Sequence, residues 1–285
     1  MADLPALPEW QLLRLPKAGS RPDECEDAGL VWDPAEPGVD GAGRPVQSLY
    51  AAVSDGASES LLARAWAEQL VGDVIDSMRL NGDWWREPEH LARDLIERST
   101  WRWESFLAQY QENRAAQGRP ITWYEQPGLE KGAFATVLGA EIRGTLLDTG
   151  DTRWSWHAFA LGDSCLFQIR DGAVHTSFPV TDLAEFGITP MLLGSRNRDW
   201  ELVARRMTVA HGELAPGDEL LLATDALAAW TLAGEAAGML PGRQLAALAP
   251  QGEEQFAEWI AHQRSGGHMR NDDVTLIRTW VRAEA

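Results

Sequence analysis

Residues 48–56, Ser-Leu-Tyr-Ala-Ala-Val-Ser-Asp-Gly, join a strand to an acidic turn. Their apolar side chains alternate along the chain, which predicts a β-strand over 48–54, and Asp55-Gly56 ends it. Aspartate is a poor strand former and is rarely buried unless it is paired or bound to a metal. Asp55 is therefore a candidate for a site at the end of this strand.

Four further aspartates stand in comparable places. Asp27 lies inside a predicted strand over 24–32, Asp163 follows Phe-Ala-Leu-Gly, Asp225 follows Leu-Leu-Leu-Ala-Thr, and Asp272 precedes a predicted closing strand over 274–281. One such residue would be a turn or a cap, whereas five indicate that the strand ends converge. Converging carboxylates raise one another's pKa unless cations neutralise them. Hard divalent ions with oxygen ligands suit this set, so the sequence predicts an Mg²⁺ or Mn²⁺ site.

The order of the expected elements favours an α+β fold. Strands are expected over 10–15, 24–32, 48–54, 134–142, 154–161, 164–170, 201–210, 219–223 and 274–281. Helices are expected from Ser58, over 88–116, from Leu227 and over 253–263, with a loop over 119–131. Because the first two helices follow one another, largely antiparallel sheets are expected instead of a doubly wound sheet. No repeat or linker divides the chain, which predicts a single domain over 1–285 with a loose N-terminal extension over 1–9.

Composition narrows the function classes. The 285 residues include 25 Lys and Arg against 43 Asp and Glu, a formal charge of -18. Such a surface repels phosphate backbones, so nucleic acid is not an expected partner. The two cysteines form neither a disulfide framework nor a zinc motif, and neither a signal peptide nor a membrane span is evident, so we expect a cytoplasmic protein with no membrane partner. The 14 tryptophans favour core packing, with an aromatic binding surface at 84–85 or 123–124 as the alternative.

Six short motifs, in order along nearly the whole chain, resemble those of one family. They are Cys25-Glu26-Asp27-Ala28 (Asn-Glu-Asp-Ala in the family), Val53-Ser54-Asp55-Gly56 (Val-Ala-Asp-Gly), residues 132–136 (a Gly-Ser-Thr strand start), residues 161–164 with the hairpin 170–172 (Gly-Asp-Ser-Arg and Arg-Asp-Gly), residues 220–226 (Leu-Leu-Leu-Ser-Asp-Gly), and residues 272–275 (Asp-Asn-Ile-Thr). Each motif alone is weak. Together they resemble the metal-dependent Ser/Thr phosphatases of the protein phosphatase 2C type, the PPM family, in a bacterial-like form.

The resemblance implies a four-layer α-β-β-α sandwich of two mainly antiparallel sheets flanked by helix pairs. It implies two Mn²⁺ or Mg²⁺ ions at one sandwich end and a third, weaker ion. Asp55 would bridge the pair, with the Gly56 carbonyl, Asp27, Asp225 and Asp272 completing it, Glu26 in or near the first shell, and Asp163 holding the outer ion. Asp55, Asp225 and Asp272 would carry catalysis. The implied reaction is hydrolysis of phosphoserine and phosphothreonine on proteins by a metal-activated water, countering a Ser/Thr kinase.

Some positions depart from the family pattern. Ala57 and Ser58 follow the Asp-Gly pair without a histidine, Ala226 stands where Gly is usual, and Asp273 replaces Asn. Arg21 is the candidate phosphate-binding arginine, although it lies one residue farther from the Glu-Asp pair than in the family. These departures keep an alternative open, a catalytically impaired relative that acts as a phosphoprotein-binding regulatory module. A non-protein phosphoester hydrolase would share the same site. A histidine four residues before Asp272, His268, is a further site candidate.

Overall fold

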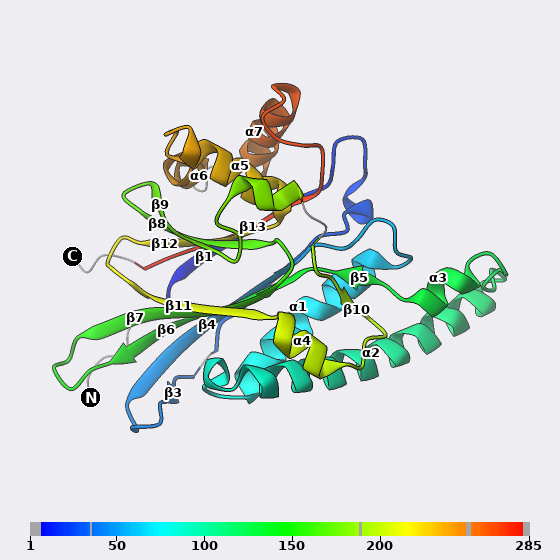
Figure 1. Ribbon diagram of the computed structural model, residues 1–285, viewed down its shortest axis with the longest axis horizontal. Coiled ribbons are helices and arrows are strands. Elements are labelled where there is room, and N and C mark those ends of the chain that lie inside the picture. The colour runs from blue at the N-terminus through cyan, green and yellow to red at the C-terminus, as the bar shows by residue number, and fades with distance from the viewer. Residues whose placement is uncertain (1–6, 35, 188–189, 249–251, 282–285) are drawn as a thin grey trace.

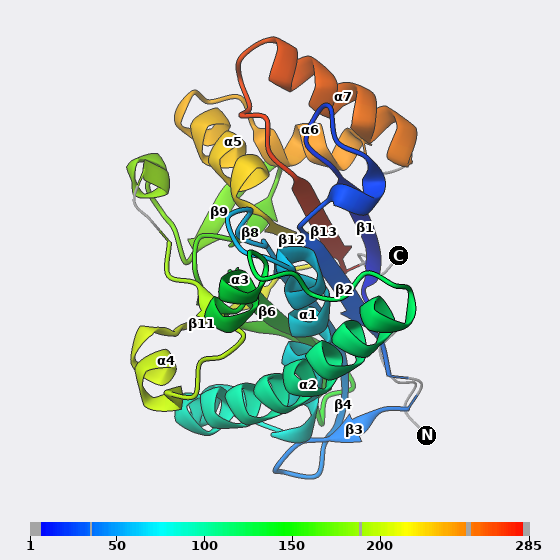
Figure 2. The ribbon, with the colours of Figure 1, turned by 90° about the vertical axis from the view of Figure 1, so that its right-hand side faces the viewer.

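The computed structural model describes residues 7–34, 36–187, 190–248 and 252–281. Two sheets stack face to face, and helices cover both outer faces (Figures 1 and 2). The five-stranded sheet runs in the order β1 (Glu9–Leu15), β13 (Val274–Trp280), β12 (Glu219–Ala223), β8 (Cys165–Arg170), β9 (Ala173–Phe178). The six-stranded sheet runs β11 (Thr208–Leu214), β7 (Thr152–Leu161), β6 (Val137–Leu146), β4 (Pro45–Ser54), β2 (Ala28–Trp32), and β3 (Gly38–Val39) pairs with β4.

The helices divide between the two faces. The long pair α1 (Ala63–Leu80) and α2 (Pro88–Ala116) covers the six-stranded sheet, and α5 (Asp225–Ala236), α6 (Pro241–Leu248) and α7 (Glu253–Ser265) cover the other sheet (Figure 1). Short helices α3 (Gln126–Lys131) and α4 (Trp200–Arg206) flank α2, and the two-stranded pair of β5 (Phe134–Ala135) and β10 (Leu193–Gly194) lies beside α1. All pairs within the sheets are antiparallel, so the predicted α+β sandwich with four layers is confirmed.

Three buried clusters fill the spaces between the layers. Between the sheets, alternate residues of β4 (Leu49, Ala51 and Val53) face strands of the other sheet. Burying such side chains stabilises the fold by about 1.5–3 kcal/mol for each large aliphatic group. Tryptophans dominate the helix layer over the six-stranded sheet, where Trp66 and Trp103 meet edge to face at 5.2 Å. The expectation that the tryptophans mainly build core is thus confirmed for these positions.

Several expected elements differ from those observed. A strand over 24–32 was expected, but Pro22–Glu24 forms a 3₁₀ turn and β2 begins at Ala28, so Asp27 precedes the strand. The expected strand over 201–210 is wrong, because α4 occupies Trp200–Arg206 and β11 starts at Thr208. Asp199 starts α4, since its side chain accepts a hydrogen bond from the Leu202 N–H at 2.9 Å.

Other differences concern helix starts and loops. The first helix starts at Ala63 and not at Ser58, and Leu62 precedes it with a φ of 67°. The expected loop over 119–131 contains α3, while the helix predicted over 88–116 coincides with α2. The Asp171-Gly172 hairpin is confirmed, with positive φ at both residues. Most of the expected N-terminal extension lies outside the described residues, and Glu9 already belongs to β1. Among the described helices, none has the length and apolar character needed to cross a membrane.

Candidate metal centre

The five aspartates stand where strands of both sheets end. Asp27 comes just before β2, and Asp55 just after β4; these strands pair so that Ala28 faces Ser54. In the other sheet Asp225 follows β12 and opens α5, and Asp272 precedes β13. Asp163 occupies the turn from β7 to β8, where Gly162 has a φ of 117°. The predicted convergence of strand ends therefore occurs at one end of the sandwich.

Asp27 is held by a threonine from the opposite sheet. Its side chain is 1% exposed, and the Thr224 hydroxyl donates to its Oδ2 at 2.7 Å. The same hydroxyl accepts from the Thr275 N–H at 2.9 Å, and the Thr224 N–H donates to the Thr275 carbonyl at 3.1 Å. Burial, followed by the charge of Asp55, raises the pKa of Asp27. Thr224 thus connects the first acidic residue to the β12–β13 pair.

Asp55 and Asp163 are joined through a short polar chain. The Asp55 N–H donates to Thr136 Oγ1 at 3.1 Å, and Thr136 Oγ1 lies 2.8 Å from Ser164 Oγ. Burial, then the negative charges of Asp272 and Asp163, raises the pKa of Asp55 to about 7. Burial also raises the pKa of Asp163, whose Oδ1 has no hydrogen-bond partner among the described residues. Burial and neighbouring negative charge therefore disfavour the ionised form of both carboxylates.

Asp225 and Asp272 share one arginine that sequence reasoning did not single out. Arg270 Nη2 pairs with Asp225 Oδ2, and Arg270 Nε lies 3.9 Å from Asp272 Oδ2. The Arg270 charge also acts to lower the pKa of both Asp55 and Asp163. An arginine two residues before a predicted metal ligand was the signal in the sequence. By itself it was indistinguishable from a solvated loop charge.

Asp273, where the family has Asn, is a structural clamp. Its Oδ1 accepts from the Lys17 N–H and its Oδ2 from the Glu26 N–H, each at 2.7 Å. Asp273 is buried, and each of its carboxylate oxygens accepts a hydrogen bond from a backbone N–H of the N-terminal loop. The Glu26 side chain accepts from Ser58 Oγ and lies 3.5 Å from Lys17 Nζ. Asp273 therefore fixes the loop that carries Glu26 and Asp27.

Backbone space and conformation account for one position that matches the family motif, Gly56, and one that departs from it, Ala226. A Cβ on Gly56 would lie 2.7 Å from the Glu26 carbonyl oxygen and 3.1 Å from that of Ala63, so a side chain is excluded there. Ala226 is buried as the second residue of α5 and is absent from the residues with positive φ, so alanine fits its helical position.

Arg21 does not join the carboxylate cluster. Its side chain is 70% exposed and pairs with Asp23 at 2.9 Å and Glu24 at 3.7 Å, both in its own turn. His268 is exposed on the loop before Arg270. The structure therefore gathers Asp27, Asp55, Asp163, Asp225 and Asp272, and it leaves Arg21 at the surface.

The donor set suits a hard divalent cation, but the cluster is not arranged around one. In the part of the chain that the structure describes, no three His, Cys, Asp or Glu side chains are grouped so that they could hold one metal ion. Arg270 lies among the acidic groups instead. Mg²⁺ and Mn²⁺ bind oxygen ligands, and all the candidate ligand atoms here are oxygens. An ion would also give Asp163 Oδ1, which has no hydrogen-bond partner among the described residues, a partner. The ligand atoms of these residues therefore suit such ions, while in the structure the positive charge among them is that of Arg270.

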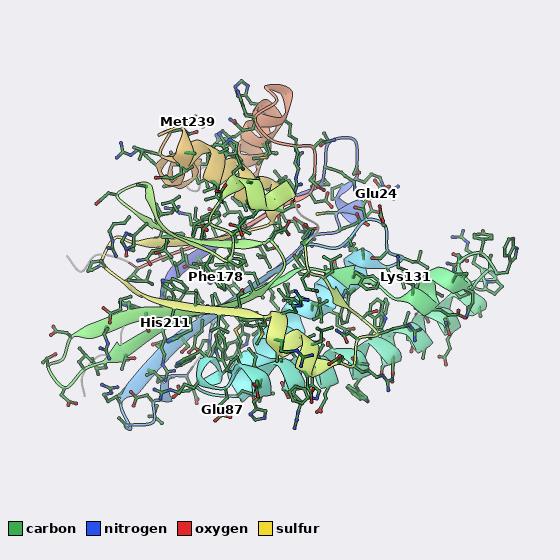
Figure 3. The ribbon with its side chains drawn as sticks, in the orientation of Figure 1. Glu24, Glu87, Lys131, Phe178, His211 and Met239 are labelled. Carbon is green, nitrogen blue, oxygen red and sulfur yellow. The ribbon has the colours of Figure 1, made fainter. Side chains whose placement is uncertain are left out.

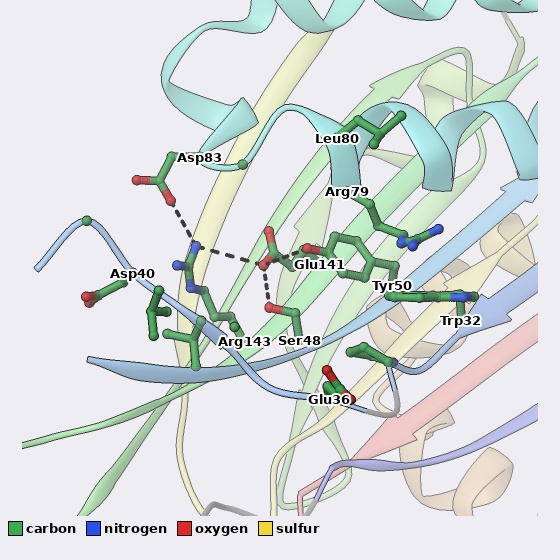
Figure 4. A pocket seen from close by; sticks show the side chains of 16 residues that line it. Trp32, Glu36, Asp40, Ser48, Tyr50, Arg79, Leu80, Asp83, Glu141 and Arg143 are labelled. Carbon is green, nitrogen blue, oxygen red and sulfur yellow. Dashed lines mark hydrogen bonds and ion pairs between the residues drawn. The ribbon is translucent and has the colours of Figure 1, made fainter. Parts of the chain in front are cut away.

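Two polar hollows lie at the other end of β4. One, of about 560 Å³, is lined by Ser48, Tyr50, Glu141, Arg143 and others. Figure 4 shows Arg143 between Asp83 and Glu141, with Ser48 Oγ donating to Glu141 at 2.6 Å. Since Ser48 is seven residues from Asp55 in an extended strand, this hollow is roughly 23 Å away from the aspartates.

The second hollow, of about 740 Å³, adjoins it along the same sheet. Trp85 stacks on His157 at 3.7 Å, and His157 faces His211 across the β7–β11 pair. Figure 3 shows His211 on the side of the molecule away from Glu24. The alternative to core packing, an aromatic binding surface at 84–85, does not have two exposed rings, because Trp84 is buried in the core and Trp85 stacks on His157. At 123–124 both rings are exposed, Trp123 by 86%.

No model of a known protein family matches the chain, and no curated protein matches its sequence. Solved structures do match its fold. The serine/threonine phosphatase Stp1 from Staphylococcus aureus aligns with a TM-score of 0.54 and 14% identity over 99% of this chain and 98% of that one. The catalytic domain of the serine/threonine protein phosphatase PstP, solved with two manganese ions, aligns with a TM-score of 0.51 and 16% identity over 97% and 99%.

A third similar structure contains the PP2C phosphatase domain of SpoIIE from Bacillus subtilis and a fragment of its regulatory domain. It aligns with a TM-score of 0.54 and 14% identity, over 98% of this chain and 65% of that one. At sequence identities this low, the similarity shows that the chains share a fold. The resemblance expected from the motifs is confirmed at that level: the chain has the fold of the PP2C-type serine/threonine protein phosphatases.

Proposed function

We propose that the chain is a metal-dependent phosphatase that hydrolyses phosphoserine and phosphothreonine on proteins. The observation that carries the proposal is the meeting of Asp27, Asp55, Asp163, Asp225 and Asp272 at one end of a PP2C-type sandwich. Burial and mutual repulsion raise the pKa of Asp27, Asp55 and Asp163. Bound cations would stabilise the ionised form of these carboxylates. Residues 1–285 would act as one catalytic domain, because both sheets contribute ligands.

The roles follow the sequence motifs. Asp55, Asp225 and Asp272, with the Gly56 carbonyl and Asp27, would hold two Mn²⁺ or Mg²⁺ ions, Asp163 would help to hold a third, and Glu26 would stand beside them. When bound, the ions would supply Lewis-acid polarisation of the phosphoryl group and a more acidic attacking water.

The surrounding residues would orient these ligands. Thr224 fixes one oxygen of Asp27, while Thr136 links the turns of Asp55 and Asp163. Asp273 anchors the loop that carries Asp27, so this ligand is positioned by residues far apart in the sequence. A site held in this way keeps its ligands in place when a substrate phosphate approaches.

The substrate would be a phosphorylated protein, and its phosphorylation would come from a Ser/Thr kinase. The acidic surface, with a formal charge of -18, disfavours nucleic acid as a partner. Arg21 remains the sequence candidate for a phosphate contact, but its pairing with Asp23 and Glu24 does not favour that role.

Phosphopeptide hydrolysis tests the proposal. Release of inorganic phosphate is measured from phosphoserine and phosphothreonine peptides in Mn²⁺, in Mg²⁺ and in excess chelator, with Asp225→Asn as the inactive control. We expect metal-dependent release that the variant lacks. Full activity in chelator would refute the metal requirement. Hydrolysis of small phosphoesters but not of phosphopeptides would favour a non-protein phosphoester hydrolase.

One observation favours the second candidate, a catalytically impaired relative that binds phosphoproteins as a regulatory module. Arg270 pairs with Asp225 and Asp272, and no three acidic or other ligand side chains of the described residues are grouped around a cation position. Binding of the same phosphopeptides without turnover in any metal would support this candidate over the first.

A further inference from the structure

Arg270 is placed among the acidic groups of the candidate centre. It pairs with Asp225 and approaches Asp272, and its charge reaches Asp55 and Asp163. One guanidinium thus interacts with four of the five aspartates. A positive charge in this position reduces the electrostatic repulsion among these carboxylates.

The other basic side chains near the centre have different partners. Lys17 Nζ lies beside Glu26, 3.5 Å away. Arg264 donates to two backbone carbonyls, those of Pro16 and Asp272. Among the described residues, Arg270 is therefore the basic group that forms ion pairs with the aspartates of the candidate centre.

The Arg270 side chain can move away from the aspartates without disturbing the core. It belongs to the loop between α7 and β13, and its side chain is 45% exposed. The neighbouring Met269 is the residue that anchors this loop in the core, with 5% exposure. Rotating the Arg270 side chain outward would cost mainly its two ion pairs.

We propose that Arg270 is a built-in counter-ion that neutralises the centre in the metal-free protein and competes with divalent ions for Asp225 and Asp272. This inference rests on the proposed function, since it assigns the metal to the same aspartates. The guanidinium pairs with carboxylate oxygens that the ions would need as ligands, so metal binding displaces the guanidinium. If Arg270 holds its position in about nine molecules of ten, it weakens apparent metal affinity about tenfold.

The test compares Arg270→Gln with wild type, and with Arg44→Gln as the matched control. Arg44 is a similarly half-exposed arginine paired with an aspartate, Asp40, in the β3–β4 hairpin. Mn²⁺ binding is measured by titration calorimetry, and melting temperature is measured in excess chelator. We expect Arg270→Gln to bind Mn²⁺ about tenfold more tightly and to melt at a lower temperature in chelator, whereas Arg44→Gln leaves Mn²⁺ affinity unchanged.

A second readout follows the guanidinium itself. Arginine modification by phenylglyoxal, located by peptide mass spectrometry, should increase at Arg270 when Mn²⁺ is added to the wild type and should stay constant at Arg44. Arg270→Lys, which keeps the charge, should restore most of the melting temperature in chelator. A merely structural arginine would not become more reactive on adding metal.

The outcomes separate this inference from the proposed function. Equal or weaker Mn²⁺ binding by Arg270→Gln overturns the counter-ion role, even if the protein hydrolyses phosphopeptides. Tight Mn²⁺ binding only after removal of Arg270 supports it, and would accompany a wild type with little activity. Absence of Mn²⁺ binding in both proteins refutes the competition and also removes the metal centre from the proposed function.

Discussion

Thr224→Val removes one hydroxyl while keeping the shape of the side chain. That hydroxyl donates to Asp27 Oδ2 at 2.7 Å and accepts from the Thr275 N–H at 2.9 Å, and Thr224 is 0% exposed. The variant leaves a buried carboxylate oxygen and a buried N–H without these partners. Each unsatisfied group costs about 1–3 kcal/mol, so we expect a loss of about 2–6 kcal/mol in the free energy of unfolding.

Thr231→Val is the matched control. Thr231 is also 0% exposed, but its hydroxyl donates at 2.8 Å to the Leu227 carbonyl within the same helix, so its removal should cost about 1 kcal/mol or less. Urea unfolding and thermal melting in chelator measure both variants. A difference of about 3 kcal/mol corresponds to roughly 6–12 °C in melting temperature. Equal losses for the two variants would show that Thr224 does not hold Asp27 as described.

Three other predictions concern the centre and the distant sheet end. Asp225→Asn should abolish phosphopeptide turnover while circular dichroism stays unchanged, and near wild-type rates would defeat its assignment. Asp163→Ala should lower turnover yet keep tight Mn²⁺ binding in calorimetry, because it serves an outer ion; loss of the tight sites would place it in the inner pair. Burial, then the Arg143 charge, lowers the pKa of His157 to about 4, so the unfolded chain binds more protons below pH 6.5 and stability falls as the pH drops from 6.5 towards 4. His157→Phe should remove up to about 2 kcal/mol of this loss of stability at low pH. The figure is smaller than the full pKa shift would give because the ring is partly solvated. Urea unfolding at pH 7 and at pH 4.5 measures the effect, and an equal stability difference between variant and wild type at the two pH values would contradict the reasoning.

The sequence was informative wherever one face of an element is buried. The alternation over 48–54 predicted β4, since Leu49 and Val53 face the other sheet. The long apolar stripe over 88–116 predicted α2 with its observed bounds. Aspartates after apolar runs indicated the strand ends that converge, because few other environments place a carboxylate there.

Features set by distant contacts could not be read in this way. The residues 200–206 form α4 because Asp199 caps it and because Val203 packs into the helix layer, while their local pattern also suits a strand. Arg270 and Thr224 gained their roles from partners across the fold, one of them 197 positions away. A single sequence shows neither the charge that faces an acidic group nor the hydroxyl that fixes it.

The last strand of the sandwich has a consequence for synthesis. β13 lies between β1 and β12 in its sheet, and Asp272 and Asp273 stand immediately before it. A chain still on the ribosome, with residues up to 271 emerged, would have β1 without its neighbour and an N-terminal loop without its clamp. Because synthesis runs from the N-terminus, the acidic centre can form only after Asp272, Asp273 and β13 have left the ribosome. A ribosome-bound fragment of this length should therefore lack any hydrolytic activity, however well its first helices have folded.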